Sequence, residues 1–379
     1  MTKQVYNHDE TVDKALFRRL NYIFDNFENI QVSISGGKDS TVLCWAALQI
    51  ARERNRKISI FFLDEEVVYD STVEQVRWLM NLYPENTIKE WLQFPFKLTN
   101  STSMSEGQLI CWEPGKSNIW MRHKEPDSIK AKPWDEKFET VGCKEKGFGF
   151  YDVLDNWQRV HPNTAFLVGL RATESPNRYR AVVKNPGFKD CYWSTKKPNG
   201  SANFYPLFDW NFHDVWKFIY DNKIRYSRIY DYQYKKGMGM QEIRVSSLIH
   251  EKAFKALVEL PEFEPKTFDR LLKRCKGIQF GNLYGKDKLM MKCRKLPKNF
   301  KTWIEYRDFL LNTYPDEDKK WIFEKRFAAQ LNNNFVARQQ CRQLILNDYE
   351  NNLPVKNTED PRDAEIEKWS FLYNKKRRC

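Results

Sequence analysis

The sequence lacks several features that define common protein classes. Its eight cysteines include no C-x-x-C pair, which argues against a zinc ribbon or a disulfide scaffold. His8, His123 and His161 show no spacing typical of metal ligands, so we expect no zinc site. Apolar segments such as 41–50 fall far short of the roughly 18–20 residues of a membrane helix. The N-terminal MTKQVYNHDE has neither the basic start nor the apolar core of a signal peptide. We therefore expect a cytoplasmic protein with no membrane contact and mostly reduced thiols.

Aromatic residues and positive charge are abundant instead. The chain is 41% hydrophobic and 15% aromatic, a composition that excludes a disordered or fibrous protein. Its net charge of +13 points to anionic partners such as nucleotides, nucleic acid or acidic proteins. Residues 231–379 hold 31 basic against 21 acidic residues, a net charge of +10. The C-terminal part could therefore bind nucleic acid or an acidic protein.

Strand and helix patterns alternate in the first half of the chain. After an amphipathic helix over 9–27, a short alternating strand leads through a glycine turn into an apolar helix, and a second cycle of the same kind follows. This alternation predicts an α/β fold with a doubly wound, mainly parallel sheet. The expected strands cover 30–34, 58–63, 88–98 and 165–168, and the expected helices 41–52, 71–83 and 212–222, the last capped by Asn211.

The second half has a different pattern. From about residue 237 helices follow one another without strands, which predicts a helical C-terminal domain. We expect a nucleotide-binding domain over 1–230, with an irregular, Trp-rich insertion or lid at about 100–146, and a basic helical domain over 231–379. The expected C-terminal helices cover 247–260, 265–276, 300–314 and 318–332.

Residues 35–40, with the sequence SGGKDS, carry the clearest chemical signal. A strand that enters a glycine turn and then a helix aims backbone N–H groups and the positive helix end at one point, where an anion can bind. The two glycines permit a tight turn, the lysine adds positive charge, and the serines add hydroxyl groups. The run matches neither G-x-x-x-x-G-K-[ST] nor G-x-G-x-x-G. The predicted phosphate-binding residues are Ser35, Gly36, Gly37, Lys38, Asp39 and Ser40, and Asp39 is also a candidate Mg²⁺ ligand.

In this context SGGKDS resembles the PP-loop of the adenine nucleotide alpha hydrolase superfamily, which has a fold of the HUP type. Two later stretches, GLRATES over 169–175 and PLFDWNFHDVW over 206–216, are similar to the phosphoadenosine phosphosulfate (PAPS) reductase family, which includes the sulfate adenylyltransferase small subunit. The resemblance implies ATP, PAPS or another adenine nucleotide as ligand, with Mg²⁺. It also implies that Gly169, Arg171 and Arg178 belong to the nucleotide site, whereas Glu174 shapes the turn or contributes further to the site.

The rest of the chain resembles a narrower group. EIRVSSLIH over 242–250 and GIQFGNLYG over 277–285 are similar to the C-terminal, DUF3440-type region of PAPS reductase-like proteins related to immunoglobulin-binding regulator A. The resemblance implies a ParB-like partner of the sulfiredoxin fold. Arg244 and His250 lie in this region. They are candidates for a further site through phosphate binding or proton transfer, although His250 could equally cap or pack a helix.

One departure from the reductase pattern leaves the reaction open. The Glu-Cys-Gly-(Ile/Leu)-His string of the family reductases is absent, and so are the paired cysteines of an iron–sulfur cluster. Cys379, the last residue, follows a basic run over 375–378 that could favour its thiolate.

We therefore expect adenylyl transfer at the α-phosphate, an ATP pyrophosphatase type of chemistry. Lys38, Asp39 and Arg171 would be catalytic, and Asp64, which follows the second strand, would contact ribose or metal. The alternatives are a thiol-dependent PAPS reductase that uses Cys379 and a nucleotide-dependent regulator that acts with a ParB-like partner or DNA.

Overall fold

The structure is a computed structural model of the chain. It describes residues 9–103, 106–142, 148–183, 186–189, 191–239, 243–250, 253–279, 296–351, 353 and 355–357. The chain folds into two compact units. The first comprises residues 1–98, 110–248 and 260–274, and the second residues 99–109, 249–259 and 275–379.

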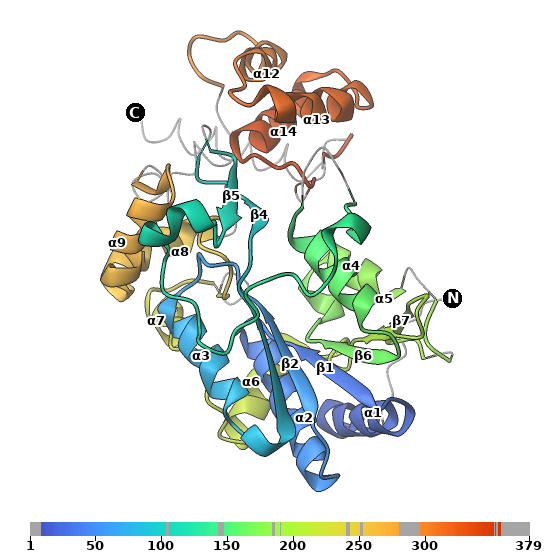
Figure 1. The fold of residues 1–379 in the computed structure, drawn as a ribbon. Helices are drawn as coiled ribbons and strands as arrows, with labels where there is room; N and C mark the ends of the chain where they lie inside the picture. Colours follow the sequence, from blue (N-terminus) through green and yellow to red (C-terminus); the bar gives the residue numbers. More distant parts are fainter. Residues whose placement is uncertain are drawn as a thin grey trace, which may run out of the picture. The chain divides into compact units, whose positions relative to one another are not determined.

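A six-stranded sheet forms the centre of the first unit (Figure 1). Its order is β3-β2-β1-β6-β8-β7, and every neighbouring pair is parallel except β7 with β8. The expected α/β fold with a mainly parallel sheet is thereby confirmed. The strands are β1 (Asn29–Ser33), β2 (Ile58–Leu63), β3 (Thr87–Leu92), β6 (Thr164–Val168), β7 (Ser194–Lys196) and β8 (Ala202–Phe204).

Helices cover both faces of this sheet. On one face α1, α2 and α6 pack together through aromatic contacts, in which the Phe218 ring meets Phe17 at 6.4 Å and Trp45 at 5.8 Å between ring centroids. On the other face α4 places Trp157 against Phe61 of β2, at 5.1 Å between centroids. The helices of the first unit are α1 (Val12–Asn26), α2 (Lys38–Glu53), α3 (Asp70–Met80), α4 (Phe150–Val160), α5 (Pro176–Val183), α6 (Phe212–Asp221), α7 (Ile229–Lys235) and α9 (Pro265–Arg274).

The expected third strand over 88–98 is wrong in its extent. β3 ends at Leu92, because the next residue turns away to pair its N–H with the carbonyl of Ile129, 2.9 Å away. The insertion at about 100–146 is thus tied to the edge of the sheet through its own residue Ile129, which forms a parallel bridge with Leu92. The chain continues into β4 (Phe96–Thr99), which pairs with β5 (Gln108–Cys111) in a separate two-stranded sheet.

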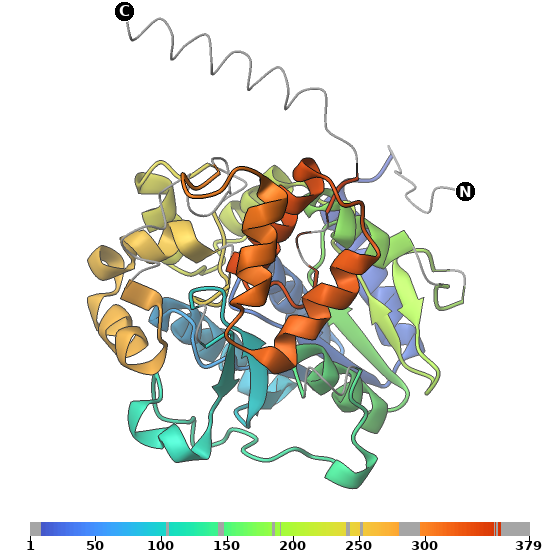
Figure 2. The same ribbon diagram turned by 90° about the horizontal axis from the view of Figure 1, so that it is seen from above.

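The described part of the second unit is helical, as expected. Its three C-terminal helices lie beside one another (Figure 2). They pack around an aromatic core in which the hydroxyls of Tyr314 and Tyr349 lie 2.7 Å apart. The helix expected over 247–260 begins later, at Phe254, and the last helix was not expected from the sequence. The helices are α8 (Phe254–Phe263), which spans both units, α12 (Trp303–Asn312), α13 (Glu317–Ala328) and α14 (Asn334–Ile345). Among the described residues, no helix combines the length and the apolar character needed to cross a membrane.

Candidate functional site

The candidate site lies where the sheet reverses its direction of growth. The loop after β1 leads into α2, and the segment after β6 begins with Gly169. Because β1 and β6 are parallel neighbours, their carboxyl ends meet at the same edge. From β1 the chain extends the sheet through β2 and β3 on one side, and it returns to add β6 on the other. Such a switch point is where open α/β sheets bind their ligands.

The SGGKDS loop adopts a conformation that only glycine suits. Gly36 has a φ of 71°, and a Cβ atom there would lie 2.7 Å from Cγ2 of Thr72 at the start of α3. Ser40 closes the turn: its hydroxyl accepts from the Ser35 N–H at 3.1 Å and donates to the Gly37 carbonyl at 3.0 Å. The loop is therefore held by its own serines before any ligand binds.

Gly169 brings the end of β6 against this loop. A Cβ atom at Gly169 would lie 3.0 Å from both the Cα and the backbone nitrogen of Ser40. The close approach explains the glycine by backbone packing, and its place in the nucleotide site stays a prediction. It also places Arg171, two residues later, beside the first turn of α2.

Three predicted catalytic residues meet at this point. The Asp39 carboxylate accepts from Nζ of Lys38 at 2.8 Å through one oxygen and from Nε of Arg171 at 2.5 Å through the other. Lys38 and Arg171 are each only 6% exposed. Two buried cations therefore share one carboxylate, which leaves one positive charge in excess at the positive end of α2.

Two aromatic rings, those of Phe212 and Tyr230, lie against the Lys38 side chain and are called the aromatic wall. Nζ of Lys38 lies 5.4 Å from the ring centroid of Phe212, the first residue of α6, and 5.8 Å from that of Tyr230 on α7. The Tyr230 hydroxyl also accepts from the backbone N–H of Lys38 at 2.9 Å. Neither aromatic residue was predicted as part of the site, because nothing local in the sequence connects residue 230 with residue 38.

Arg178 and Glu174 form an exposed pair. Nε of Arg178 lies 3.8 Å from the Glu174 carboxylate, and the two side chains are 47% and 35% exposed. In the free protein this is an exposed ion pair of the kind that contributes little to stability, and the phosphate contact that the resemblance implied for Arg178 stays a prediction.

Asp64, which the sequence predicts to contact ribose or metal, is held by protein donors in the structure. Its carboxylate is fully buried and accepts from Nε1 of Trp91 and Nε2 of Gln93, each at 2.8 Å, and also from Arg122. A carboxylate with this many protein donors has little capacity left for a ligand.

Two further acidic residues follow Asp64 at the end of β2. Glu66, fully buried, accepts from Nε of Arg274 at 2.6 Å and from the Trp112 N–H at 2.6 Å. Among the described residues no cation pairs with Glu65 in this way. Burial, with the neighbouring Asp64 charge, raises the pKa of Glu65 to about 7, and a hydrogen bond from Ser247 opposes this rise. Sequence reasoning missed Glu65 and Arg274.

The described residues offer few candidates for metal ligands or for reactive thiols. Within the described residues, no group of three or more His, Cys, Asp or Glu side chains could hold a metal ion. Both oxygens of Asp39 are engaged by cations, so the described side chains do not form a Mg²⁺ site as arranged; Mg²⁺ arriving with ATP would take phosphate oxygens and waters. The described thiols are all buried, and burial raises the pKa of Cys191 to about 11. Cys379 lies outside the described residues.

Arg244 and His250 fall in different units. Arg244 belongs to the first, where its backbone pairs with the side chain of Gln233. His250 belongs to the second, just before α8. The further role proposed for the two side chains stays a prediction.

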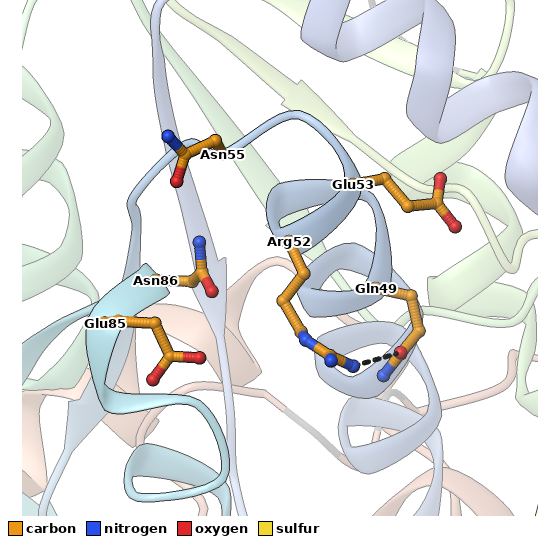
Figure 3. Close-up of a pocket in the computed structure, with 6 residues that line it drawn as sticks. All are labelled: Gln49, Arg52, Glu53, Asn55, Glu85 and Asn86. Atoms are coloured by element: carbon orange, nitrogen blue, oxygen red, sulfur yellow. Dashed lines mark hydrogen bonds between the residues drawn. The ribbon is translucent and has the colours of Figure 1, made fainter.

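A surface pocket lies at the other end of α2 (Figure 3). The helix has 16 residues, so its last turn is about 24 Å from the loop at its start. The pocket is polar and open, and in Figure 3 Arg52 extends toward Gln49, to which it donates a hydrogen bond of 3.3 Å. It is separate from the candidate site. Its lining residues are Gln49, Arg52, Glu53, Asn55, Glu85 and Asn86.

Several known proteins are similar to this chain. The uncharacterized Escherichia coli protein YbdN is 27% identical over 312 residues, which cover 80% of this chain and 75% of YbdN. An uncharacterized protein of Methanocaldococcus jannaschii is 23% identical over 231 residues, 59% of this chain and 45% of that protein. Among solved structures, a PAPS reductase from Candida auris is 14% identical, with a TM-score of 0.35, and the match covers 60% of this chain and 94% of that one. The FMN adenylyltransferase of Candida glabrata is 14% identical, with a TM-score of 0.33, over 61% of this chain and 64% of that one.

Family comparison divides the chain at residue 237. Residues 237–338 match a domain of unknown function, DUF3440, as the sequence predicted for the C-terminal region. Residues 29–237, more than half of the chain, match the phosphoadenosine phosphosulfate reductase domain. They include the SGGKDS loop, Arg171 and the aromatic wall. The chain therefore belongs to the phosphoadenosine phosphosulfate reductase domain family.

Proposed function

We propose that the chain binds the phosphates of ATP or a related adenine nucleotide at the SGGKDS loop and catalyses adenylyl transfer. The observation that carries this proposal is the convergence of two buried cations, Lys38 and Arg171, on Asp39 at the start of α2. Membership in the PAPS reductase domain family supports an adenine nucleotide as the ligand.

The ion pairs of Asp39 suit exchange with an incoming phosphate. In the free protein the carboxylate satisfies the cations, which would otherwise be buried without a counter-charge. A phosphate group carries more negative charge than the carboxylate and can also take the backbone N–H groups of the first helical turn, which have no acceptor within the helix. Binding would therefore replace Asp39 on at least one cation.

The reaction needs no covalent step on the protein. A hydroxyl or carboxylate oxygen of the acceptor attacks the α-phosphorus, the bond from that phosphorus to the bridging oxygen of the β-phosphate breaks, and pyrophosphate leaves; a proton on the attacking oxygen passes to solvent. Lys38 and the loop amides would stabilise the charge on the phosphoryl oxygens, and Arg171 would hold the phosphate in line.

Binding and turnover of α-labelled ATP with Mg²⁺ test this proposal. We expect calorimetric binding of ATP by the wild type, release of pyrophosphate with AMP or an AMP-bearing product, and loss of affinity by about tenfold or more in Lys38→Met. Lys217→Met is the matched control, since Lys217 on α6 is 76% exposed and pairs only with Asp221 among described residues. Equal ATP affinity in wild type and Lys38→Met would contradict the proposal.

Family membership also favours a second candidate, thiol-dependent reduction of PAPS. That reaction requires a nucleophilic thiol, for which the sequence offers Cys379. It predicts that Cys379→Ser abolishes sulfite release from PAPS in the presence of a dithiol reductant while nucleotide affinity is unchanged. Nucleotide binding without turnover of either substrate would instead support a regulator that acts with a ParB-like partner or DNA, and a salt titration of DNA binding would test that role.

A further inference from the structure

Tyr230 presents a hydrogen-bond donor with no acceptor at the loop. The residue is only 3% exposed, and its hydroxyl oxygen accepts from the Lys38 N–H at 2.9 Å. A tyrosine hydroxyl can accept and also donate one hydrogen bond. Among the residues that the structure describes, none accepts a hydrogen bond from this hydroxyl. A buried donor without a partner is costly, so a ligand is the expected acceptor.

The hydroxyl lies where an anion would bind. Lys38 is the first residue of α2, and the N–H groups of a first turn point toward the ligand position at a helix start. A hydroxyl that accepts from this N–H therefore lies close enough to the anion position to contact a bound ligand directly. Burial and the nearby charges of Asp39 and Glu174 raise the pKa of Tyr230, and the hydrogen bond from the Lys38 N–H and the charge of Arg171 oppose this rise, so the group keeps its proton at any physiological pH.

The surrounding structure holds this hydroxyl in position. The Tyr230 ring meets the Trp216 ring edge-on, with centroids 5.3 Å apart. One turn later on α7, the buried side chain of Gln233 accepts from the Arg244 N–H at 2.9 Å and donates to the Arg244 carbonyl at 3.1 Å. The helix that carries Tyr230 is thus fixed on both sides, which reduces the entropy lost when a ligand binds.

We infer that Tyr230 is an oxyanion-binding residue of this site, whose hydroxyl donates to a non-bridging oxygen of the bound phosphate, or of the sulfate in a sulfonucleotide, while it still accepts from the Lys38 N–H. The inference rests on the proposed function and deepens it. The hydroxyl adds one hydrogen-bond donor to those at the start of α2. The hydrogen bond from the Lys38 N–H to this hydroxyl and the one from the hydroxyl to the ligand oxygen polarise each other.

Tyr230→Phe removes the donor and keeps the ring. Calorimetry with ATP and, in a separate arm, with PAPS should show affinity weaker by about tenfold for the ligand that the site takes. Tyr234→Phe is the matched control, because Tyr234 lies on the same helix and is 68% exposed; it should bind as the wild type does. Unchanged or tighter binding by Tyr230→Phe would overturn the inference, since a hydroxyl that merely covers the Lys38 N–H would release that group to the ligand when removed.

The binding results for the wild type, Lys38→Met and Tyr230→Phe together distinguish failure of the proposed function from failure of the role assigned to Tyr230. If the wild type binds ATP or PAPS and Lys38→Met does not, while Tyr230→Phe binds normally, the proposed function stands and the role of Tyr230 is wrong. If the wild type binds neither nucleotide, both are wrong. Should Tyr230→Phe fail to fold, 3-fluorotyrosine at position 230 retains the hydroxyl and makes it a stronger donor. Affinity should then rise a few-fold, and unchanged affinity would overturn the inference.

Discussion

Neighbouring strand ends in this protein use similar charged residues for different purposes. At the end of β2, Asp64 and Glu66 are fully buried and bound by Arg122 and Arg274, with tryptophan and backbone donors completing their hydrogen bonds. At the ends of β1 and β6, a single carboxylate, that of Asp39, serves two cations.

The difference lies in the balance of donors and acceptors. At the β2 end every described carboxylate oxygen of Asp64 and Glu66 has a protein donor, so the group is complete and acts as a structural clamp. At the β1 end donors outnumber acceptors among the described residues, with two cations on one carboxylate and no acceptor for the Tyr230 hydroxyl. A surplus of buried donors, and not the number of charged residues, therefore distinguishes a binding site from a structural ion pair.

The largest expected effect breaks the structural clamp. Arg274→Met leaves the Glu66 carboxylate fully buried without its cation, which should lower the free energy of unfolding by about 3–5 kcal/mol. Urea titration followed by tryptophan fluorescence measures it. The double variant Glu66→Gln with Arg274→Met should recover part of the loss, because no buried charge then remains unpaired. A single variant as stable as the wild type would show that the two strand ends do not differ as described.

A change at the other strand end should affect the ligand more than the fold. Arg171→Gln leaves Asp39 paired with Lys38, so we expect a smaller loss of stability than in Arg274→Met and an ATP affinity lower by about tenfold. Arg178→Gln, which alters the exposed pair, should weaken binding less. Calorimetry of both variants shows which of the two arginines contributes more to nucleotide binding. A larger effect at Arg178 would support the phosphate contact that the resemblance implied.

The smallest expected effect concerns Glu65, the acidic residue at the β2 end without a cation. Its pKa is raised from 4.5 to about 7 in the folded chain, so between these values the folded state holds a proton more tightly than the unfolded state, and wild-type stability falls as pH rises through this window. Glu65→Gln mimics the protonated form. Its melting temperature should match the wild type near pH 4.5 and exceed it by about 2 °C above pH 7. Glu85→Gln, at an exposed position, is the control, and a difference independent of pH would refute the assignment.

Local patterns were sufficient to predict the loop and four strands of the sheet, but not β7 and β8. The strand, glycine turn and helix around residues 35–40 are encoded within a few residues, and the φ of Gly36 is a property that only glycine meets readily. Arg171 followed from the resemblance of GLRATES. In contrast, 192 residues separate Tyr230 from Lys38, and 208 separate Arg274 from Glu66. No local periodicity records such contacts, so both residues were missed.

Asp64 shows that the position of a residue on the sheet does not by itself determine what its side chain contacts. The rule that ligands bind at the carboxyl ends of strands placed this residue at the proper edge of the sheet. Whether its carboxylate faces a ligand depends on donors supplied by Trp91, Gln93 and Arg122, and Arg122 comes from the insertion, whose path the sequence did not predict. Similarly, the extent of the third strand was misjudged because Ile129 of the same insertion takes the hydrogen bond that would have continued it.

The pairing of Gln233 with the Arg244 backbone bears on how the two matched regions of the chain can evolve. The two residues lie on opposite sides of the family boundary at residue 237, as do Glu66 and Arg274. A recombination event at that boundary that brought in a segment without arginine at position 274 would leave Glu66 without its cation in the interior of the first unit, and a segment with a different backbone path would not meet Gln233. The two sequence families are then expected to have evolved here as a single heritable block, with neither half free to be exchanged alone.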